Sequence, residues 1–121
     1  IMKIAFTTSG NDLNAPLDNR FGRAEKFLIY DLENDTFEII DNRQNLNAAQ
    51  GAGIQSAETI VRSGAKALVT AHCGPKAFRV LQSAGVKIYT TSAATVASAL
   101  ADYRAGKLSE SKSEDVAGHW I

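Results

Sequence analysis

The pair His72-Cys73 offers the most reactive chemistry in the chain, because Cys73 is its only cysteine and His72 is one of two histidines. Both residues follow a short apolar run and precede Gly74-Pro75, where a helix should begin. A helix N terminus lowers the pKa of a nearby thiol, and the resulting thiolate binds copper, iron or molybdenum-linked sulfide. Cys73 and His72 are therefore candidate metal ligands.

Other interpretations of these two residues stay open. Free cysteine is among the most buried residue types, so Cys73 could equally be a small apolar residue that ends a strand. His72 could be a loop histidine satisfied by its neighbours, and successive residues of an extended chain point apart, so the two need not reach one ligand. A zinc site takes three or four ligands, which this pair cannot supply alone.

A second group of residues suits an anion. Arg20 and Arg23 flank Phe21-Gly22, and Lys76 follows the proline that should open a helix. Glycines in the GAG segment, Gly51–Gly53, would let the backbone approach a ligand closely. Three predicted helix N termini add unpaired N–H groups and the positive ends of dipoles. Together these features predict an anion pocket with one soft donor, although the arginines could also be solvated charges.

Catalytic interpretations find little support in the sequence. A cysteine nucleophile needs a base within hydrogen-bond distance, and adjacent residues of an extended chain point apart. Two-metal chemistry needs carboxylates at the centre of the sheet, but the apolar runs MKIAFTT and ALVTA contain none. The Walker and G-x-G-x-x-G patterns are also absent from the sequence. We expect a protein that is not an enzyme.

Composition limits the possible partners. Thirteen basic and thirteen acidic residues give a net charge of zero, whereas nucleic-acid binders carry an excess of lysine and arginine. The hydrophobic fraction is 45%, and no apolar run approaches the roughly 20 residues of a membrane helix. One cysteine and no signal-peptide pattern predict a cytoplasmic location. We therefore expect no membrane and no nucleic acid among the partners.

The elements that position these residues follow from periodicity and turn chemistry. Strands are predicted where short runs are rich in apolar, aromatic or β-branched residues, at Met2–Thr8, Lys26–Leu32, Thr36–Asp41, Ala67–Ala71 and Val86–Tyr89. Helices are predicted where an apolar period near 3.6 ends at a glycine, over Gly53–Ser63, from Gly74-Pro75 to Gly85, and from an N-cap at Ser92 to Gly106. Their inward faces should be Ile54, Ala57, Ile60 and Val61; Ala77, Val80, Leu81 and Ala84; and Val96, Leu100 and Tyr103.

This order of elements predicts an α/β domain over residues 1–108, with 109–121 as a mobile tail. Short connections and right-handed crossovers favour a mixed five-stranded sheet in the order 3-2-1-4-5 with helices on its faces. One edge of that sheet collects the loops at 7–12, 18–23, 44–53, 72–74 and 90–92. Ligands of open α/β sheets bind at this edge near a topological switch point, which we expect between the first and fourth strands.

Three segments of the chain resemble the dinitrogenase iron-molybdenum cofactor biosynthesis family, which includes NifX, NafY and the C-terminal part of NifB. The segments are LDNRFGRAEKFLIYD, GAGIQSAETIVRSGAKALVTAHCGPKAFRVLQSAGVKIYTT and VASALADYRAGKL. The resemblance runs from Met2 to about Leu108. Its more specific elements are R-F-G-R-A-x-x-F at Arg20–Phe27 and a strand-G-P-x-A-helix unit at Ala67–Leu81.

The resemblance implies a ribonuclease-H-like fold and non-catalytic binding or carriage of an anionic metal-sulfur cluster. It points to a molybdenum-copper-sulfide cluster, as in members from sulfate-reducing bacteria, or alternatively to iron-molybdenum cofactor or a precursor. It also implies partner proteins in cluster assembly or delivery. The alternative is an interaction or regulatory module without stable cluster binding. Residues and resemblance together give the candidate site Thr8, Ser9, Arg20, Phe21, Gly22, Arg23, Gly51, Gly53, His72, Cys73, Gly74 and Lys76.

Overall fold

The computed structural model describes residues 2–45 and 51–111. Six strands in this part of the chain form one sheet in the order β3-β2-β1-β4-β5-β6. The strands are β1 (Lys3–Thr8), β2 (Lys26–Asp31), β3 (Thr36–Asp41), β4 (Ala67–Thr70), β5 (Lys87–Thr90) and β6 (Glu110–Ser111). The helices are η1 (Arg43–Asn45), a 3-10 turn, and α1 (Ala52–Ser63), α2 (Pro75–Ser83) and α3 (Val96–Arg104).

The sheet is mixed, as the sequence predicts. β1 pairs antiparallel with β2, and β2 pairs antiparallel with β3, whereas β1, β4 and β5 run parallel to one another. This confirms the α/β class and the order 3-2-1-4-5. The sixth strand was not predicted: Glu110 and Ser111 pair antiparallel with β5, although they fall in the predicted tail. The rest of that tail, 112–121, lies outside the described residues.

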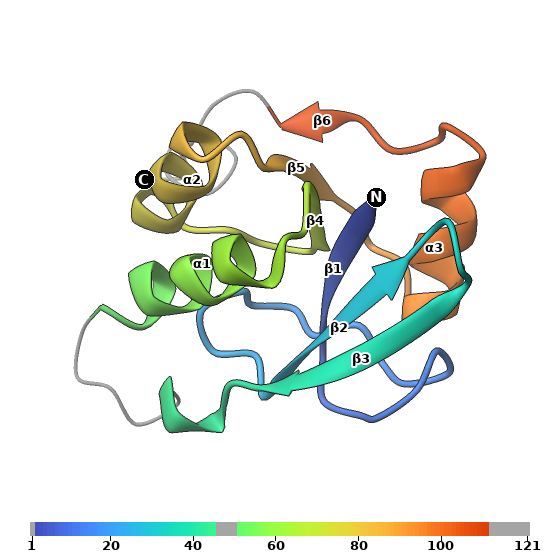
Figure 1. Cartoon of the computed structure of the whole chain (residues 1–121), viewed down its shortest axis with the longest axis horizontal. Coiled ribbons are helices and arrows are strands. Elements are labelled where there is room, and N and C mark those ends of the chain that lie inside the picture. The colour runs from blue at the N-terminus through green and yellow to red at the C-terminus, as the bar shows by residue number, and fades with distance from the viewer. Residues whose placement is uncertain (1, 46–50, 112–121) are drawn as a thin grey trace.

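Helices cover both faces of the sheet (Figure 1). α1 and α2 lie side by side on one face, where Ile60, Phe78 and Leu81 pack on Leu68 of the central strand β4. α3 lies on the other face, with a separate apolar cluster that includes Phe6, Leu28, Val69, Val96 and Leu100. The central strands are buried on both sides, which is why their sequences read as continuous apolar runs rather than alternating ones.

Two of the predicted inward positions are wrong. Val61 of α1 is 38% exposed, and Ala84 lies exposed at the end of α2, whereas Phe78 is 1% exposed. α2 contacts both α1 and the sheet, so its buried stripe is turned toward Ala77, Phe78 and Leu81. The predicted faces of α1 and α2 are otherwise confirmed at Ala57 and Ile60 and at Ala77 and Leu81.

No helix in the described ranges is long and apolar enough to cross a bilayer.

The start of α3 also differs from the prediction. Ser92 was expected as the N-cap, but the helix begins at Val96 with Thr95 as N-cap. The Thr95 hydroxyl accepts a hydrogen bond from the backbone N–H of Ser98 at 3.1 Å. Ser92 and Thr95 are both hydroxyl residues that favour the N-cap position, so the local sequence could not decide between them. Ser92 instead lies in the loop that follows β5.

Candidate functional site

The loop after β1 crosses the carboxyl ends of β1 and β4. The backbone of Asp18 is held by Thr7, whose carbonyl accepts from Asp18 N at 2.8 Å and whose hydroxyl donates to Asp18 O at 2.9 Å. Farther along, Phe21 N donates to His72 O at 3.1 Å, and Arg20 forms a parallel bridge with His72. The predicted crevice between the first and fourth strands is therefore occupied by this loop. Two cavities lie beside it.

Thr8 helps to hold this loop in place. Its fully buried hydroxyl donates to Pro16 O at 2.7 Å and accepts from Gly10 N at 3.1 Å. The single proton of the hydroxyl is therefore used within the protein. Ser9, the next predicted contact, is exposed at the start of the loop and lines neither of the two cavities. The structure thus gives Thr8 a supporting role rather than a place against a ligand.

The first cavity, which we call the helix-end cavity, has a volume of about 370 Å³ and lies where the first turns of α1 and α2 meet. Six predicted site residues line it, joined by Ile54, Pro75 and Ala77. Neither helix has a side-chain cap, because their N-cap residues are Gly51 and Gly74. The six predicted residues that the structure brings together here are Phe21, Gly22, Gly51, Gly53, Gly74 and Lys76.

Close backbone packing forms the floor of the helix-end cavity. A Cβ atom on Gly22 would lie 3.0 Å from the Cα and 3.1 Å from the nitrogen of Gly53, so a side chain here would press against the backbone of α1. Phe21 is 1% exposed, and its ring lies 5.5 Å from that of Phe27. Gly22 therefore lets the loop pack closely on Gly53, whereas the close approach expected of Gly51 and Gly53 was to a ligand.

Only two of the three expected helix N termini can attract an anion at this edge. The first N–H groups of α3 are already used: Val96 N donates to Ala15 O at 3.0 Å, and Ala97 N donates to Leu13 O at 2.7 Å. The loop after β1 thus caps α3 from outside the helix. The positive ends of the α1 and α2 dipoles remain, and both meet at the helix-end cavity.

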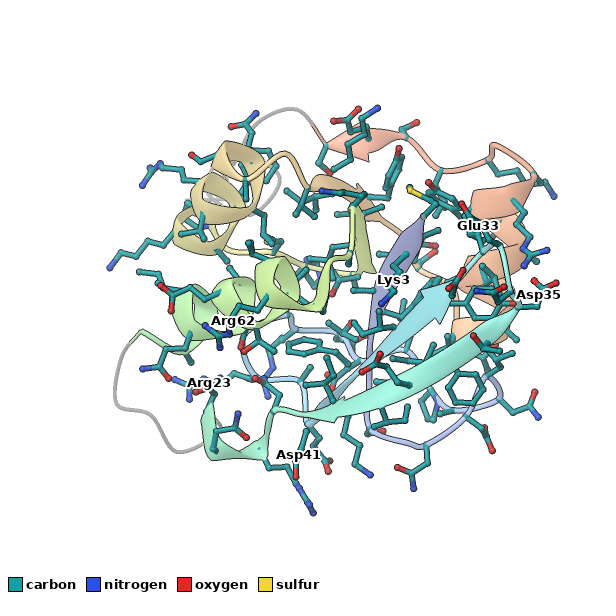
Figure 2. The ribbon with its side chains drawn as sticks, viewed as in Figure 1. Lys3, Arg23, Glu33, Asp35, Asp41 and Arg62 are labelled. Atoms are coloured by element: carbon teal, nitrogen blue, oxygen red, sulfur yellow. The ribbon has the colours of Figure 1, made fainter. Side chains whose placement is uncertain are left out.

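The two arginines lie apart from this cavity. Arg23 donates from Nη1 to Asn45 O at 3.3 Å, and Figure 2 shows it beside η1, below α1 in that view. Arg20 is exposed, on the segment that pairs with His72. Among the described residues, neither arginine lines either cavity. Lys76 is the cationic side chain that the structure places at the helix-end cavity.

Cys73 is buried beneath the same segment. Its side chain is 2% exposed in the cluster that packs α1 and α2 on the sheet, and its thiol donates to Gly74 O at 3.8 Å. Burial raises the pKa of Cys73 to about 12, so the expectation of a partly ionised thiol is wrong. The cause is desolvation, because a thiolate among these apolar side chains would lose its hydration. Cys73 is a neutral thiol near pH 7.

His72 has the opposite environment. It is exposed, as alternation along an extended chain predicts for the neighbour of a buried residue. The structure thus confirms the alternation, with one side chain exposed and the other buried. Within the described ranges, no group of three or more histidine, cysteine, aspartate or glutamate side chains comes together around a common point.

His72 lines the second cavity, which we call the strand-end cavity. Its volume is about 700 Å³, and it lies at the carboxyl ends of the parallel strands β4 and β5. From the sequence we expected the loop 90–92 at this edge but predicted no site residue in it. The signal was present in the sequence as three consecutive hydroxyl residues, of which Thr90 ends β5 and Thr91 and Ser92 follow it. The lining residues are Asn19, Ala71, His72, Thr90, Thr91, Ser92 and Ala93.

Comparison with known proteins gives a consistent result. The family model described as dinitrogenase iron-molybdenum cofactor matches residues 2–106. A protein of Methanocaldococcus jannaschii whose function is uncharacterized is 33% identical over 111 residues, which are 89% of this chain and 90% of that protein.

Two solved structures share both the fold and a third of the sequence. The apo form of the orange protein from Desulfovibrio gigas superposes with a TM-score of 0.90 at 35% identity, covering 93% of this chain and 95% of that one. An NMR structure from Thermotoga, of a protein assigned to NifB, gives a TM-score of 0.80 at 34% identity, with 91% and 93% covered.

Proposed function

Because the chain belongs to the dinitrogenase iron-molybdenum cofactor family, we propose that it binds and carries an anionic metal-sulfur cluster in the helix-end cavity. The observation that supports this most is the convergence of two uncapped helix N termini and Lys76 on one cavity. Backbone N–H groups at helix N termini bind anions, and the dipoles favour negative charge. A lysine at the same place adds a full positive charge.

The lining of the cavity also suits the surface of such a cluster. Sulfides are soft and polarizable, and the half-buried side chains of Ile54 and Pro75 offer apolar surface against which they can pack. Lys76 and the N–H groups of the two helix ends offset the charge. Neutral Cys73 makes no bond to metal in this proposal, so the cluster is held by electrostatics and packing. Binding of this kind leaves the cluster free to be passed on.

The cargo we propose is a molybdenum-copper-sulfide cluster, with iron-molybdenum cofactor or a precursor as the alternative. Likeness to the orange protein supports the first, and the family description supports the second. We further propose that the chain acts in the cytoplasm, not as an enzyme but as a carrier that exchanges its cluster with partner proteins. Exposed His72 and buried Cys73 lack the mutual contact that a thiol-dependent reaction would need.

Anaerobic reconstitution tests this proposal. Apoprotein is incubated with tetrathiomolybdate and copper(I), or separately with iron-molybdenum cofactor precursors, and charge-transfer absorption is followed through gel filtration. Lys76→Gln should weaken retention about tenfold or more, because it removes a charged contact from a partly desolvated anion. Lys87→Gln is the matched control, since Lys87 is an exposed lysine at the first position of β5 and does not line the helix-end cavity. Cys73→Ala should retain the cluster.

Each result has a clear meaning. Retention of the absorbing species by the wild type and by Lys87→Gln, with loss in Lys76→Gln, supports the helix-end cavity. Equal retention by the wild type and Lys76→Gln would show that the cluster binds elsewhere. If the wild type retains no metal at all, the carrier proposal fails, and an interaction module without stable cluster binding becomes the better explanation.

A further inference from the structure

We propose that the strand-end cavity is a second, separate site that binds a tetrahedral oxyanion through uncharged hydrogen-bond donors. The cavity draws its polar side chains from three segments that are far apart in the sequence: the loop after β1, the end of β4 and the end of β5. These side chains belong to Asn19, His72, Thr90, Thr91 and Ser92. Each of them can donate a hydrogen bond, and each carries no formal charge when the imidazole is neutral.

The hydrogen bonds already made by Thr91 leave its proton available. Its hydroxyl oxygen accepts from Ala93 N at 3.1 Å, so the oxygen is held in place by the loop. Its backbone N–H donates to Thr70 O at 3.0 Å and is not available to a ligand. A threonine hydroxyl has one proton, and here it is not needed for the contact with Ala93. Thr91 is thus a positioned donor at the cavity wall.

The charge of the lining distinguishes this cavity from the first one. Among the described residues that line it, none is aspartate, glutamate, lysine or arginine. Asp18, the neighbour of Asn19 in the chain, does not line the cavity, and its Oδ1 accepts a hydrogen bond from the backbone N–H of Arg20 at 3.4 Å. A lining that has hydrogen-bond donors but no carboxylate suits an ion whose oxygens only accept, such as molybdate or sulfate, because no negative charge of the lining repels the ion.

The position in the fold supports a binding role. Ligands of open α/β sheets bind outside the carboxyl ends of parallel strands, and this cavity lies there on β4 and β5. Its lining offers hydroxyl, amide and imidazole hydrogen-bond donors, whereas the helix-end cavity combines apolar side chains with a lysine and the N termini of two helices. The two sites therefore differ in chemistry: one suits oxygen atoms, the other soft sulfide. The larger volume accommodates an anion together with its hydration water.

Isothermal titration calorimetry of the metal-free protein with sodium molybdate tests the site, with sodium sulfate as a competitor of the same shape. We expect saturable binding with one ion per chain and competition by sulfate. His72→Ala should lower the affinity about tenfold, because a hydrogen bond to an ion is lost. Thr90→Val should do the same, and both changes leave the Thr91 loop contact intact. Thr59→Val on α1 is the control, since Thr59 bonds only within its helix.

The outcome is independent of the proposed cluster site. Lys76→Gln should leave molybdate affinity unchanged while it weakens cluster retention, and His72→Ala should do the reverse. The oxyanion proposal is overturned if the wild type shows no saturable heat of binding at millimolar molybdate, or if both His72→Ala and Thr90→Val bind as the wild type does. It is also overturned if these two variants lose the cluster instead, since the larger cavity would then hold the cluster.

Discussion

Two neighbouring residues, His72 and Cys73, show how strongly environment decides chemistry. They are adjacent in the chain, yet one side chain is exposed and the other is 2% exposed among apolar atoms. Alternation along the chain predicted that they would point apart. The pKa of the thiol could not be predicted in the same way, because it depends on burial in an apolar cluster to which Phe21, Phe27 and Ile60 come from other segments.

The raised pKa of Cys73 makes stability depend on alkaline pH. The ordinary value is 9.0 and the folded value is about 12, so between these limits the unfolded chain releases a proton that the folded chain keeps. The contribution of the neutral thiol to the free energy of unfolding should therefore be constant below pH 9. Above pH 9 the free energy of unfolding should fall by up to about 1.4 kcal/mol per pH unit. Urea unfolding of the wild type and Cys73→Ala between pH 7 and pH 11 measures this contribution.

The comparison isolates the thiol because tyrosine and lysine side chains titrate in both proteins. The stability of the wild type relative to Cys73→Ala should be constant below pH 9 and should decline above it. Two profiles that remain parallel up to pH 11 would mean that the sulfur ionises as readily in the folded state as in the unfolded one. The thiol would then be accessible, and a role as a metal ligand would have to be considered again.

At the scale of elements, the helices were predictable in number and place, but their ends were not. Pro75 at the first position of α2 identified that start from sequence alone. α3 offered two candidate caps, and the structure selected Thr95. The reason lies outside the helix: Leu13 and Ala15 accept hydrogen bonds from its first turn and so fix where the turn begins. A contact between segments so far apart in the sequence leaves no local signal.

The two caps can be told apart by stability. Thr95→Ala should lower the free energy of unfolding by about 1 kcal/mol, because the N–H of Ser98 loses its acceptor. Ser92→Ala should change it by less than about 0.5 kcal/mol, as expected for an exposed residue without a capping contact. Chemical denaturation followed by circular dichroism gives both values. A larger loss from Ser92→Ala than from Thr95→Ala would restore the start that the sequence predicted.

At the scale of the molecule, strand order and the edge that collects the loops followed from sequence, but the cavities did not. Parallel strands force the ends of β1, β4 and β5 to one edge, and that edge holds both cavities. Their positions depend on how the loop 16–24 lies across β1 and β4, through bonds such as that of Phe21 N to His72 O. Of the predicted site residues, six therefore line the helix-end cavity, and His72 lines the strand-end cavity.

The sheet also extends past the predicted domain boundary at Leu108, and this difference can be tested by truncation. A chain that ends at Leu108 lacks β6 and leaves the edge of β5 uncovered, whereas a chain that ends at Ser111 keeps the pairs of Glu110 with Tyr89 and of Ser111 with Ile88. Losing these backbone hydrogen bonds should lower the free energy of unfolding by about 1 to 2 kcal/mol. An uncovered edge strand also pairs readily with other chains.

The two truncated chains are compared by urea denaturation and by gel filtration over a range of concentrations, with the full chain as reference. The chain ending at Ser111 should have the same free energy of unfolding as the full chain. The chain ending at Leu108 should have a lower one and should associate more strongly as its concentration rises. Equal stability and equal elution of the two would show that β6 adds nothing to the sheet. In that case Leu108 would be the true end of the domain. A loss confined to the shorter chain would instead show that β6 protects the edge of β5. Thr90 at the end of β5 lines the strand-end cavity, so this cover would also support the proposed oxyanion site.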